Sequence, residues 1–348
     1  MKMKMKKKIL LLDALPGELF EKEIEGYNSP EIELIVNIQD DTQEYSQNSN
    51  YCFERVNIDA HNMQQILSIA RQFGGFHAIK MRKNVPFRKE LLYLLTDKEL
   101  NTPLKIIGQA GVGVDHIDIQ TANLLNIEVV NTPGSNAAAV AEFTLLQMLA
   151  LLRQTDWHQQ QLRKGRWTKN IYSPSRSLSD VCIGLVGSGA ISRALLSLLK
   201  PFNPRVTILG SSRFTAEDAS MLGVNRASSL RALVSQNDII SLHLPLTAET
   251  RHLINSDILP HFTKGACLLN TARGNLIDET ALVSFMQEHP GWISGVALDT
   301  FENEGAQYST PMQGVDGVLL TPHIAGSTTS AVLNAALRIQ QTILARLR

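Results

Sequence analysis

The sequence predicts an α/β protein of two domains, each built on a parallel sheet. Its 348 residues exceed the typical size of one domain, about 150 residues, and suggest two. Short apolar runs of strand length alternate with helix-like segments, which is the order that gives parallel sheets. The runs are apolar almost throughout, as expected of strands that are covered on both faces.

The first part of the chain, up to about residue 100, contains few clear elements. Lys8–Leu12 is predicted to be a strand, and the polar stretch Gln39–Asn50 is predicted to be a loop. Met63–Phe73 has the pattern of a helix. No catalytic motif is found in this part of the sequence.

The pattern becomes regular from Pro103 onward. An apolar run at Leu104–Ile107 precedes the glycine-rich turn Ala110–Asp115, and a second run follows at Ile127–Val130. Ala137–Gln161 places apolar side chains at a spacing near about 3.6 residues, which predicts one long helix. Such a helix could connect the two domains.

A second series of strands and helices opens at Val181–Val186, after a loop rich in serine and proline at Ser173–Ser179. The number of strand candidates that follow suits a doubly wound sheet. These candidates are Val206–Leu209, Asp238–Leu242, Cys267–Asn270, Ile293–Leu298 and Val318–Leu320.

Charge and cysteine content exclude several classes of function. Lys+Arg and Asp+Glu are balanced at 33 each, so no net field favours nucleic acid or an anionic membrane. A small-molecule ligand fits better. Cys52, Cys182 and Cys267 are widely spaced, which predicts neither a metal site nor a disulfide framework and indicates a cytoplasmic protein.

Targeting and membrane insertion are not expected either. The lysine-rich start, Met1–Lys8, is followed by an apolar run that stops at Asp13, too early for a signal peptide. No stretch reaches the roughly 20 apolar residues of a membrane span.

A dinucleotide fingerprint follows the strand predicted at Val181–Val186. Gly187 permits a tight turn, and Gly189 lets backbone amides of Ala190 and Ile191 approach a pyrophosphate at a helix N-terminus. The third glycine of the pattern is replaced by Ser192, at a position that serves helix–strand packing. Taken alone, this segment could also be an ordinary strand–helix turn.

The end of the next strand indicates which cofactor is bound. An acidic residue that would bind the ribose hydroxyls is lacking there, and Ser211, Ser212 and Arg213 stand in its place. Two hydroxyls and a guanidinium suit a 2′-phosphate, so NADP(H) is the preferred cofactor. NAD(H) stays possible if Arg213 only stacks on adenine or is solvated.

Six further segments, in this order and spacing, resemble the D-isomer-specific 2-hydroxyacid dehydrogenases, which include phosphoglycerate dehydrogenases and glyoxylate/hydroxypyruvate reductases. The resemblance spans roughly residues 76 to 340 and is far more specific than one glycine motif. The segments are Gly111–Asp118 (GVGVDHID), Asn131–Glu142, His243–Thr250, Asn270–Gly274 (NTARG), Asp299–Glu304 (DTFENE) and Thr321–Gly326 (TPHIAG).

The resemblance implies two Rossmann-like domains, with the cofactor domain inserted into the substrate domain. Residues 1–140 and 322–348 would form a flavodoxin-like substrate-binding (catalytic) domain, and residues 141–321 the NAD(P)-binding domain. It also implies a homodimer and a reaction that interconverts a 2-keto acid and a D-2-hydroxy acid.

Three residues are expected to carry the chemistry. Arg273 follows a predicted strand, and its planar fork suits a substrate carboxylate and keto oxygen. His323 can exchange a proton near neutral pH, and Glu304 would bond its other ring nitrogen and raise its pKa. A surface arginine and a structural histidine are the alternatives that the motifs disfavour.

In the family pattern, the catalytic glutamate stands five residues after the aspartate that corresponds to Asp299. This spacing selects Glu304, and Glu302 is expected to be solvated. The family usually has proline after this glutamate. This chain has Gly305, so the loop is expected to be more mobile.

Further contacts are implied by the resemblance alone. Asp299 would accept a hydrogen bond from the nicotinamide amide, and backbone amides of Val112 and Gly113 would bind the substrate carboxylate. Arg82, beside Lys83, would contact a second anionic group, unless this basic loop is simply solvated. The residues expected along the cofactor's path are Leu244, Pro245, Thr250 and Thr271.

A second class of function also fits the fold, that of a cofactor-sensing regulator such as the corepressors of the family. Retention of Arg273, Glu304 and His323 argues for an enzyme.

Overall fold

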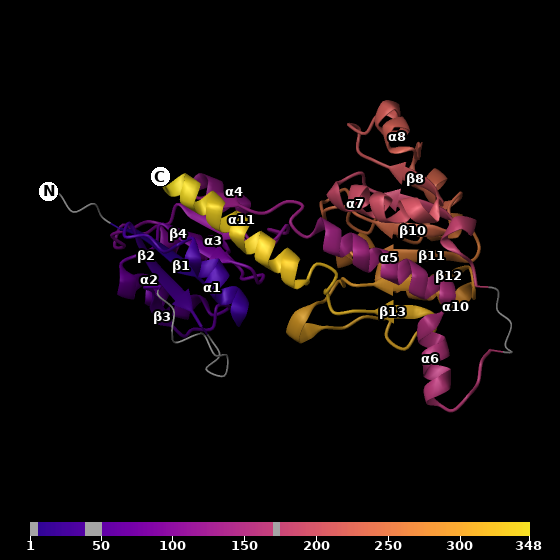
Figure 1. Cartoon of the computed structure of the whole chain (residues 1–348), viewed down its shortest axis with the longest axis horizontal. Helices are drawn as coiled ribbons and strands as arrows, with labels where there is room; N and C mark the ends of the chain where they lie inside the picture. Colours follow the sequence, from indigo (N-terminus) through magenta and orange to yellow (C-terminus); the bar gives the residue numbers. More distant parts are fainter. Residues whose placement is uncertain (1–5, 39–50, 170–174) are drawn as a thin grey trace. The chain divides into compact units, whose positions relative to one another are not determined.

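The computed structural model describes residues 6–38, 51–169 and 175–348. The chain forms two compact units, and the second is inserted into the sequence of the first (Figure 1). The first unit comprises Met1–Asn136 and Thr328–Arg348, and the second comprises Ala137–Ser327. The predicted loop Gln39–Asn50, the first five residues and the start of the loop at 173–179 lie outside the described residues.

The first unit is built on a six-stranded parallel sheet with the order β3-β2-β1-β4-β5-β6. The order reverses between β1 and β4, and such a switch point is where parallel sheets bind ligands. The strands are β1 (Lys7–Leu11), β2 (Ile32–Asn37), β3 (Glu54–Val56), β4 (Ala78–Met81), β5 (Ile106–Gln109) and β6 (Glu128–Val130).

Helices cover both faces of this sheet because its strands alternate apolar side chains between them. Ile9 and Leu11 pack toward α1 and α11, while Leu10 and Leu12 pack in the core on the opposite face. The helix α11 comes from the end of the chain, as expected for an inserted second domain. The helices are α1 (Glu18–Glu25), α2 (Met63–Phe73), α3 (Lys89–Leu95), α4 (Ile119–Leu124) and α11 (Thr329–Leu347).

The second unit is built on a seven-stranded parallel sheet with the order β13-β12-β11-β10-β7-β8-β9. Its order reverses between β7 and β10, where the fingerprint turn follows β7. The strands are β7 (Cys182–Val186), β8 (Arg205–Leu209), β9 (Asn225–Arg226), β10 (Ile239–Leu242), β11 (Ala266–Asn270), β12 (Ile293–Leu298) and β13 (Val318–Leu320).

Two cores lie on the two faces of this sheet. Residues of α5, α7 and α8 contribute to one, and residues of α9 and α10 contribute to the other. The parallel α/β class predicted for both domains is therefore confirmed. The helices are α5 (Ala137–Arg153), α6 (Thr155–Arg163), α7 (Ala190–Leu199), α8 (Ala216–Leu222), α9 (Leu230–Val234) and α10 (Glu279–Glu288).

The prediction of one continuous helix over Ala137–Gln161 is wrong. The chain forms α5 and α6, and between them Gln154 adopts a left-handed conformation with φ of 47°. A non-glycine residue rarely takes this conformation, and one such residue ends the helical path. The regularly spaced apolar residues end at Leu152, just before the break, and α6 is mostly polar.

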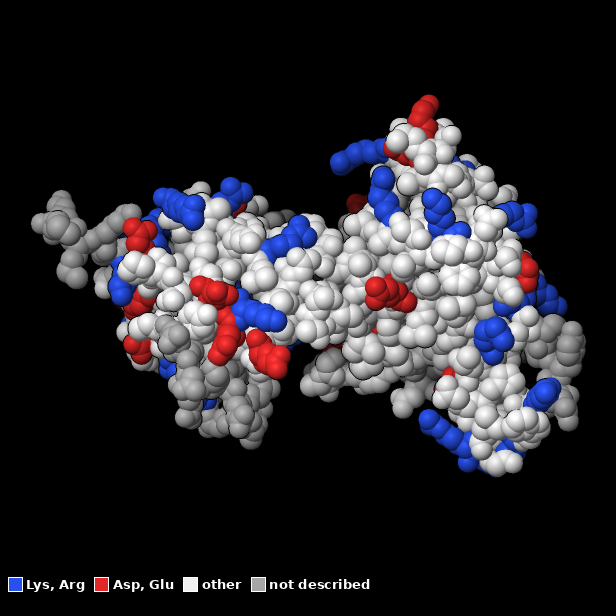
Figure 2. Space-filling model, in the orientation of Figure 1, with Lys and Arg blue, Asp and Glu red and all other residues white. Residues whose placement is uncertain are grey.

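The surface has no continuous stripe of one charge on the face drawn in Figure 2, where basic and acidic side chains are interspersed. Within the described ranges, no helix combines the length and the apolar character needed to cross a bilayer.

Candidate active site

The turn after β7 has the geometry that a pyrophosphate requires. Gly187 has φ of 113°, and a Cβ atom there would lie 2.3 Å from the His243 carbonyl oxygen, so only glycine fits. Gly189 is the N-cap residue of α7, so no side chain caps the first N–H groups of this helix. The space where a Cβ of Gly189 would lie is open. The N–H groups at Ala190 and Ile191 therefore begin the helix with room for an anion in front of them.

Ser192 replaces the third glycine without opening this turn. Its side chain is buried, and its hydroxyl donates a hydrogen bond of 2.7 Å to the Gly187 carbonyl. The substitution therefore fixes the turn with a polar contact that a glycine could not make.

The loop after β8 carries the residues predicted to choose the cofactor. Ser211, Ser212 and Arg213 are all exposed, while Phe214 behind them is buried. Arg226 donates from Nε to the Phe214 carbonyl at 2.9 Å and so ties the loop to β9. An exposed guanidinium and two hydroxyls on an anchored loop can bind a phosphate.

The turn after β10 lies against the fingerprint. The Leu244 side chain lies 3.3 Å from the point where a Cβ of Gly187 would be. Thr250 closes the turn by donating to the Pro245 carbonyl at 2.8 Å. Thr271, at the end of β11, is buried, and its hydroxyl lies 3.1 Å from that of Thr144 on α5.

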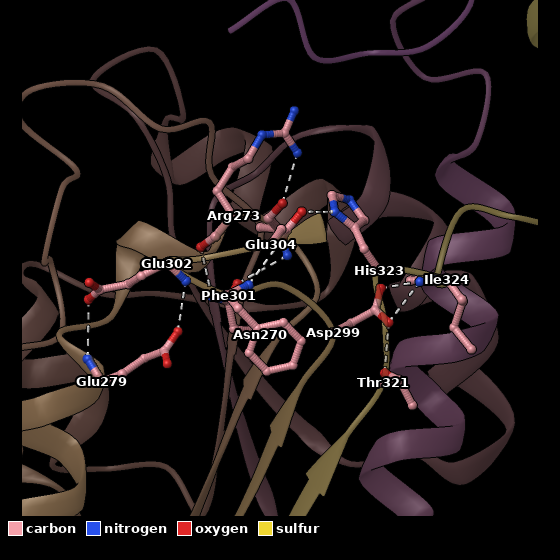
Figure 3. Close-up of polar contacts among 12 residues, drawn as sticks. Asn270, Arg273, Glu279, Asp299, Phe301, Glu302, Glu304, Thr321, His323 and Ile324 are labelled. Carbon is pink, nitrogen blue, oxygen red and sulfur yellow. Dashed lines mark hydrogen bonds and ion pairs between the residues drawn. The ribbon is translucent and has the colours of Figure 1, made fainter. Parts of the chain in front are cut away.

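Arg273 stands on a short turn that β11 holds in shape. The Asn270 amide donates to the Arg273 carbonyl at 2.7 Å and accepts from the Ala272 N–H at 3.0 Å. The Arg273 side chain lies beyond the strand ends, together with Glu304 and His323 (Figure 3).

Glu304 and His323 form a hydrogen-bonded pair. Glu304 Oε2 lies 2.9 Å from His323 Nδ1, and the side chains are 35% and 43% exposed. The other carboxylate oxygen of Glu304 accepts the Phe301 N–H at 3.0 Å. His323 has φ of 54°, an uncommon value for a side-chain-bearing residue that is often found at functional sites. The contact uses Nδ1, so the other ring nitrogen, Nε2, takes no part in the pair.

The pair shifts both pKa values in the sense that favours an ion pair. The hydrogen bond that His323 donates to Glu304 raises the pKa of His323 above its usual 6.5, against the effect of burial. Burial raises the pKa of Glu304, but its hydrogen bond and attraction to His323 outweigh this and lower the pKa below 4.5. Arg273 lowers the pKa of both groups through its charge.

Asp299 holds the segment that carries His323. Its carboxylate is buried and accepts three hydrogen bonds, from the Thr321 hydroxyl at 2.7 Å and from the N–H groups of Ile324 and Ala325 at 2.9 and 2.8 Å. These contacts explain how a left-handed His323 is maintained. The contact predicted between Asp299 and nicotinamide stays a prediction.

The expectation that Glu302 is solvated is wrong. Its Oε1 lies 3.2 Å from Nε2 of His252, and its side chain is 29% exposed. Glu302 lies in the segment Asp299–Glu304, but nothing in that segment indicates His252 as its partner.

The residues predicted to bind substrate from the first unit lie at the ends of β4 and β5. These strands are paired, and Gln109 donates from its amide to the Arg82 carbonyl at 2.9 Å. Val112 is exposed, Gly113 is half-buried, and Asn131 donates to the Val112 carbonyl at 2.7 Å. The structure thus brings the Arg82 and Val112 loops to one edge of this sheet.

A buried charge cluster that was not predicted from the sequence lies at the same edge. Lys80 is fully buried, 2.5 Å from Glu23 and 3.7 Å from Asp13. Asp13 also accepts the Arg82 N–H at 2.6 Å, so it fixes the backbone of that loop. In the sequence, this cluster was indicated only by Asp13, which ends the apolar run of the first strand.

Comparisons with known proteins agree with this geometry. Residues 145–325, just over half of the chain, match the family model described as "D-isomer specific 2-hydroxyacid dehydrogenase, NAD binding domain". A glyoxylate reductase from Thermofilum pendens is 38% identical over 261 residues, which cover 72% of this chain and 76% of that protein.

Two solved structures share the fold. A D-lactate dehydrogenase from Aquifex aeolicus, complexed with NAD and lactic acid, has a TM-score of 0.77 at 24% identity and covers 98% of this chain and 95% of its own. An acyclic imino acid reductase in complex with NADPH and D-Arg has a TM-score of 0.76 at 25% identity, with coverages of 98% and 97%. The chain therefore belongs to the D-isomer specific 2-hydroxyacid dehydrogenase family, whose members are NAD-dependent oxidoreductases that act on the CH–OH group.

Proposed function

We propose that the protein reduces a small 2-keto acid to the D-2-hydroxy acid, with His323 and Glu304 as the acid/base pair and Arg273 as the substrate-orienting residue. The observation that carries this proposal is the 2.9 Å contact between Glu304 and His323, beside Arg273. The family match supports the reaction class, and the glyoxylate reductase supports a short substrate.

His323 supplies the proton in the reducing direction. Its Nδ1 is bonded to Glu304, so Nε2 carries the proton that passes to the substrate's carbonyl oxygen. The raised pKa of His323 favours the protonated form of the imidazole. A bound nicotinamide supplies the hydride that attacks the carbonyl carbon, and the reverse reaction returns both hydride and proton.

Arg273 holds the substrate by its carboxylate. A guanidinium can donate two parallel hydrogen bonds, to a carboxylate oxygen and to the adjacent keto oxygen, and so polarise the carbonyl. Backbone amides of Val112 and Gly113 would bind the same carboxylate, and Arg82 would take a second anionic group where the substrate has one.

NADP(H) is the preferred cofactor in this proposal, and NAD(H) is also accepted. The loop with exposed Ser211, Ser212 and Arg213 would bind the 2′-phosphate, while the turn from Gly187 to Ile191 would bind the pyrophosphate. Leu244, Pro245, Thr250 and Thr271 would line the path between them, and Asp299 would meet the nicotinamide amide.

Three further expectations complete the proposal: a homodimer, a cytoplasmic location, and domain borders near residues 140 and 321. The structure divides at Asn136/Ala137 and at Ser327/Thr328. Size-exclusion chromatography with light scattering would measure the oligomeric state.

Oxidation of NADPH and NADH by the purified protein, followed by nicotinamide absorbance with a panel of 2-keto acids, tests the proposal. Glyoxylate, hydroxypyruvate, pyruvate and phenylpyruvate would grade the size of the pocket. We expect turnover with a short keto acid and a higher kcat/KM with NADPH. Tight cofactor binding without turnover on any acid would instead favour the regulator.

A further inference from the structure

The buried carboxylate of Glu279 ties the loop that carries Glu304 to helix α10. Glu279, the first residue of α10, is 2% exposed. One of its oxygens accepts the Glu302 N–H at 2.9 Å, and the other accepts the Thr310 hydroxyl at 2.6 Å. Figure 3 shows the first of these contacts. Because residues 302 and 310 bracket Glu304, one side chain fixes both ends of its loop.

The contact between Glu279 and Glu302 is supported from the other side. The Glu302 carboxylate faces the Glu279 N–H at 3.5 Å and lies 3.2 Å from His252 Nε2. Between the two ties, the loop closes on itself through Asn303 and Ser309, whose side chains are 3.3 Å apart. The loop is thus held at both ends, at Glu302 and Thr310, and is closed between them by the contact of Asn303 with Ser309.

The remainder of the loop has backbone freedom that these ties restrict. Gly305 directly follows Glu304 and has φ of 77°, a conformation that glycine enters and leaves at little cost. Without the ties, rotation about Gly305 and its neighbours would move the Glu304 carboxylate relative to His323. Displacements near 1 Å at a catalytic group can cost about 100-fold in rate.

Electrostatics does not explain why a carboxylate occupies this position. Burial, together with the neighbouring charges of Glu302 and Glu304, raises the pKa of Glu279, so its negative charge is disfavoured there. The carboxylate is instead well suited to accept two hydrogen bonds from two separate points of one loop.

We propose that Glu279 is a positioning residue for the acid/base pair, which it serves by holding the Glu302–Thr310 loop so that Glu304 stays bonded to His323. This inference rests on the proposed function of that pair. Glu279 acts through Thr310 and through the Glu302 backbone, and it takes no part in proton transfer itself.

Thr310→Val tests the tie with little change of shape, since it removes one hydroxyl and leaves Glu279 in place. We expect kcat to fall about tenfold, with the Kd of the reduced cofactor unchanged, because the loop moves and the pyrophosphate turn does not. The alkaline limb of the pH–rate profile should move to lower pH, since a loosened Glu304 raises the pKa of His323 less. Thr310→Ser keeps the hydroxyl, so its kcat and its pH–rate profile should match those of the wild type.

The pKa of His323 gives a readout that does not depend on activity. Besides Glu304, the charged groups that act on it are Asp299, which raises its pKa, and Arg273, which lowers it. NMR titration of the imidazoles, with the His323 signal assigned by His323→Gln, should show a lower pKa in Thr310→Val. Glu279→Gln keeps an acceptor for the Glu302 N–H, so the pKa of His323 should decrease less in this variant than in Thr310→Val. Glu279→Gln also provides the test if Thr310→Val does not fold.

Thr300→Val is the matched control. Thr300 is 1% exposed, and its hydroxyl has no hydrogen-bond partner within the described part of the chain. The same chemical change there should leave kcat and the pH profile at wild-type values. A pH profile and a His323 titration that stay unchanged in both Thr310→Val and Glu279→Gln would overturn the inference.

His323→Ala in the same series separates this inference from the proposed function. If His323→Ala abolishes turnover while Thr310→Val and Glu279→Gln both match the wild type, the pair is catalytic and only the positioning role of Glu279 is wrong. If His323→Ala keeps normal turnover, the proposed acid/base pair is wrong.

Discussion

Glu304 and His323 are 19 residues apart in the chain, yet their side chains meet at 2.9 Å. Glu304 comes from the loop after β12 and His323 from the turn after β13, and these strands are paired in parallel. Because parallel neighbours end at the same edge of a sheet, two separate loops deliver the two halves of the pair. This arrangement leads to the first two predictions.

His323→Ala should lower kcat by about 100-fold or more, since general acid catalysis contributes roughly 10²- to 10⁴-fold. The cofactor turn at Gly187 is a separate segment, so the Kd of NADPH should change less than about threefold. Steady-state kinetics and fluorescence titration of the bound cofactor measure the two quantities. A large loss of cofactor affinity would mean that the substitution disrupts the site as a whole.

Glu304→Gln should shift the pH dependence of keto acid reduction to lower pH. The carboxylate raises the pKa of His323, so the wild-type enzyme keeps its proton to a pH above 6.5 and loses activity as the pH rises through that pKa. Removing the charge should move this alkaline limb down by about one pH unit. The profile of kcat/KM against pH measures this shift. An alkaline limb that stays in place would show that a group other than His323 determines it.

Arg213→Ala should weaken NADPH binding far more than NADH binding. Loss of a guanidinium–phosphate contact costs about 1.5–3 kcal/mol, which corresponds to a 10- to 150-fold rise in the Kd of NADPH. Arg231, an exposed arginine on α9, offers the matched control, and Arg231→Ala should leave both affinities unchanged. Equal losses for the two cofactors in Arg213→Ala would favour stacking on adenine over a phosphate contact.

The sequence was most informative where a single segment determines its own structure. β12, β13 and α2 match the predicted ranges because each has a continuous apolar run or a clear helical period. β2, β3, β4 and β9 were not predicted. β3 and β9 are short and largely exposed, and only pairing with a neighbour makes them strands.

Side-chain contacts between distant segments were harder to predict. The pairing of Glu304 with His323 could be expected only because a family motif contains both. Lys80 and Asp13 are 67 residues apart, and nothing in either segment indicates the other. Their contact depends on β1 and β4 being neighbours, which the sequence alone did not establish.

Lys80→Met should destabilise the first unit strongly. Lys80 is fully buried, and the carboxylates of Glu23 and Asp13 beside it are almost fully buried as well. Removing one partner of a buried ion pair leaves uncompensated charge and typically costs about 3–5 kcal/mol in the free energy of unfolding. Chemical denaturation measures the loss, and Lys105→Met, at an exposed position, should change stability by less than about 0.5 kcal/mol.

The loss in Lys80→Met should also depend on pH. Burial already raises the pKa of Asp13, and the Lys80 charge counteracts this. Without Lys80, the folded state holds a proton on Asp13 that the unfolded state releases, so stability falls as the pH rises. The destabilisation should therefore be larger near about pH 8 than near about pH 5. A loss that is the same at both values would mean that Lys80 stabilises the sheet through packing of its aliphatic chain and not through its charge.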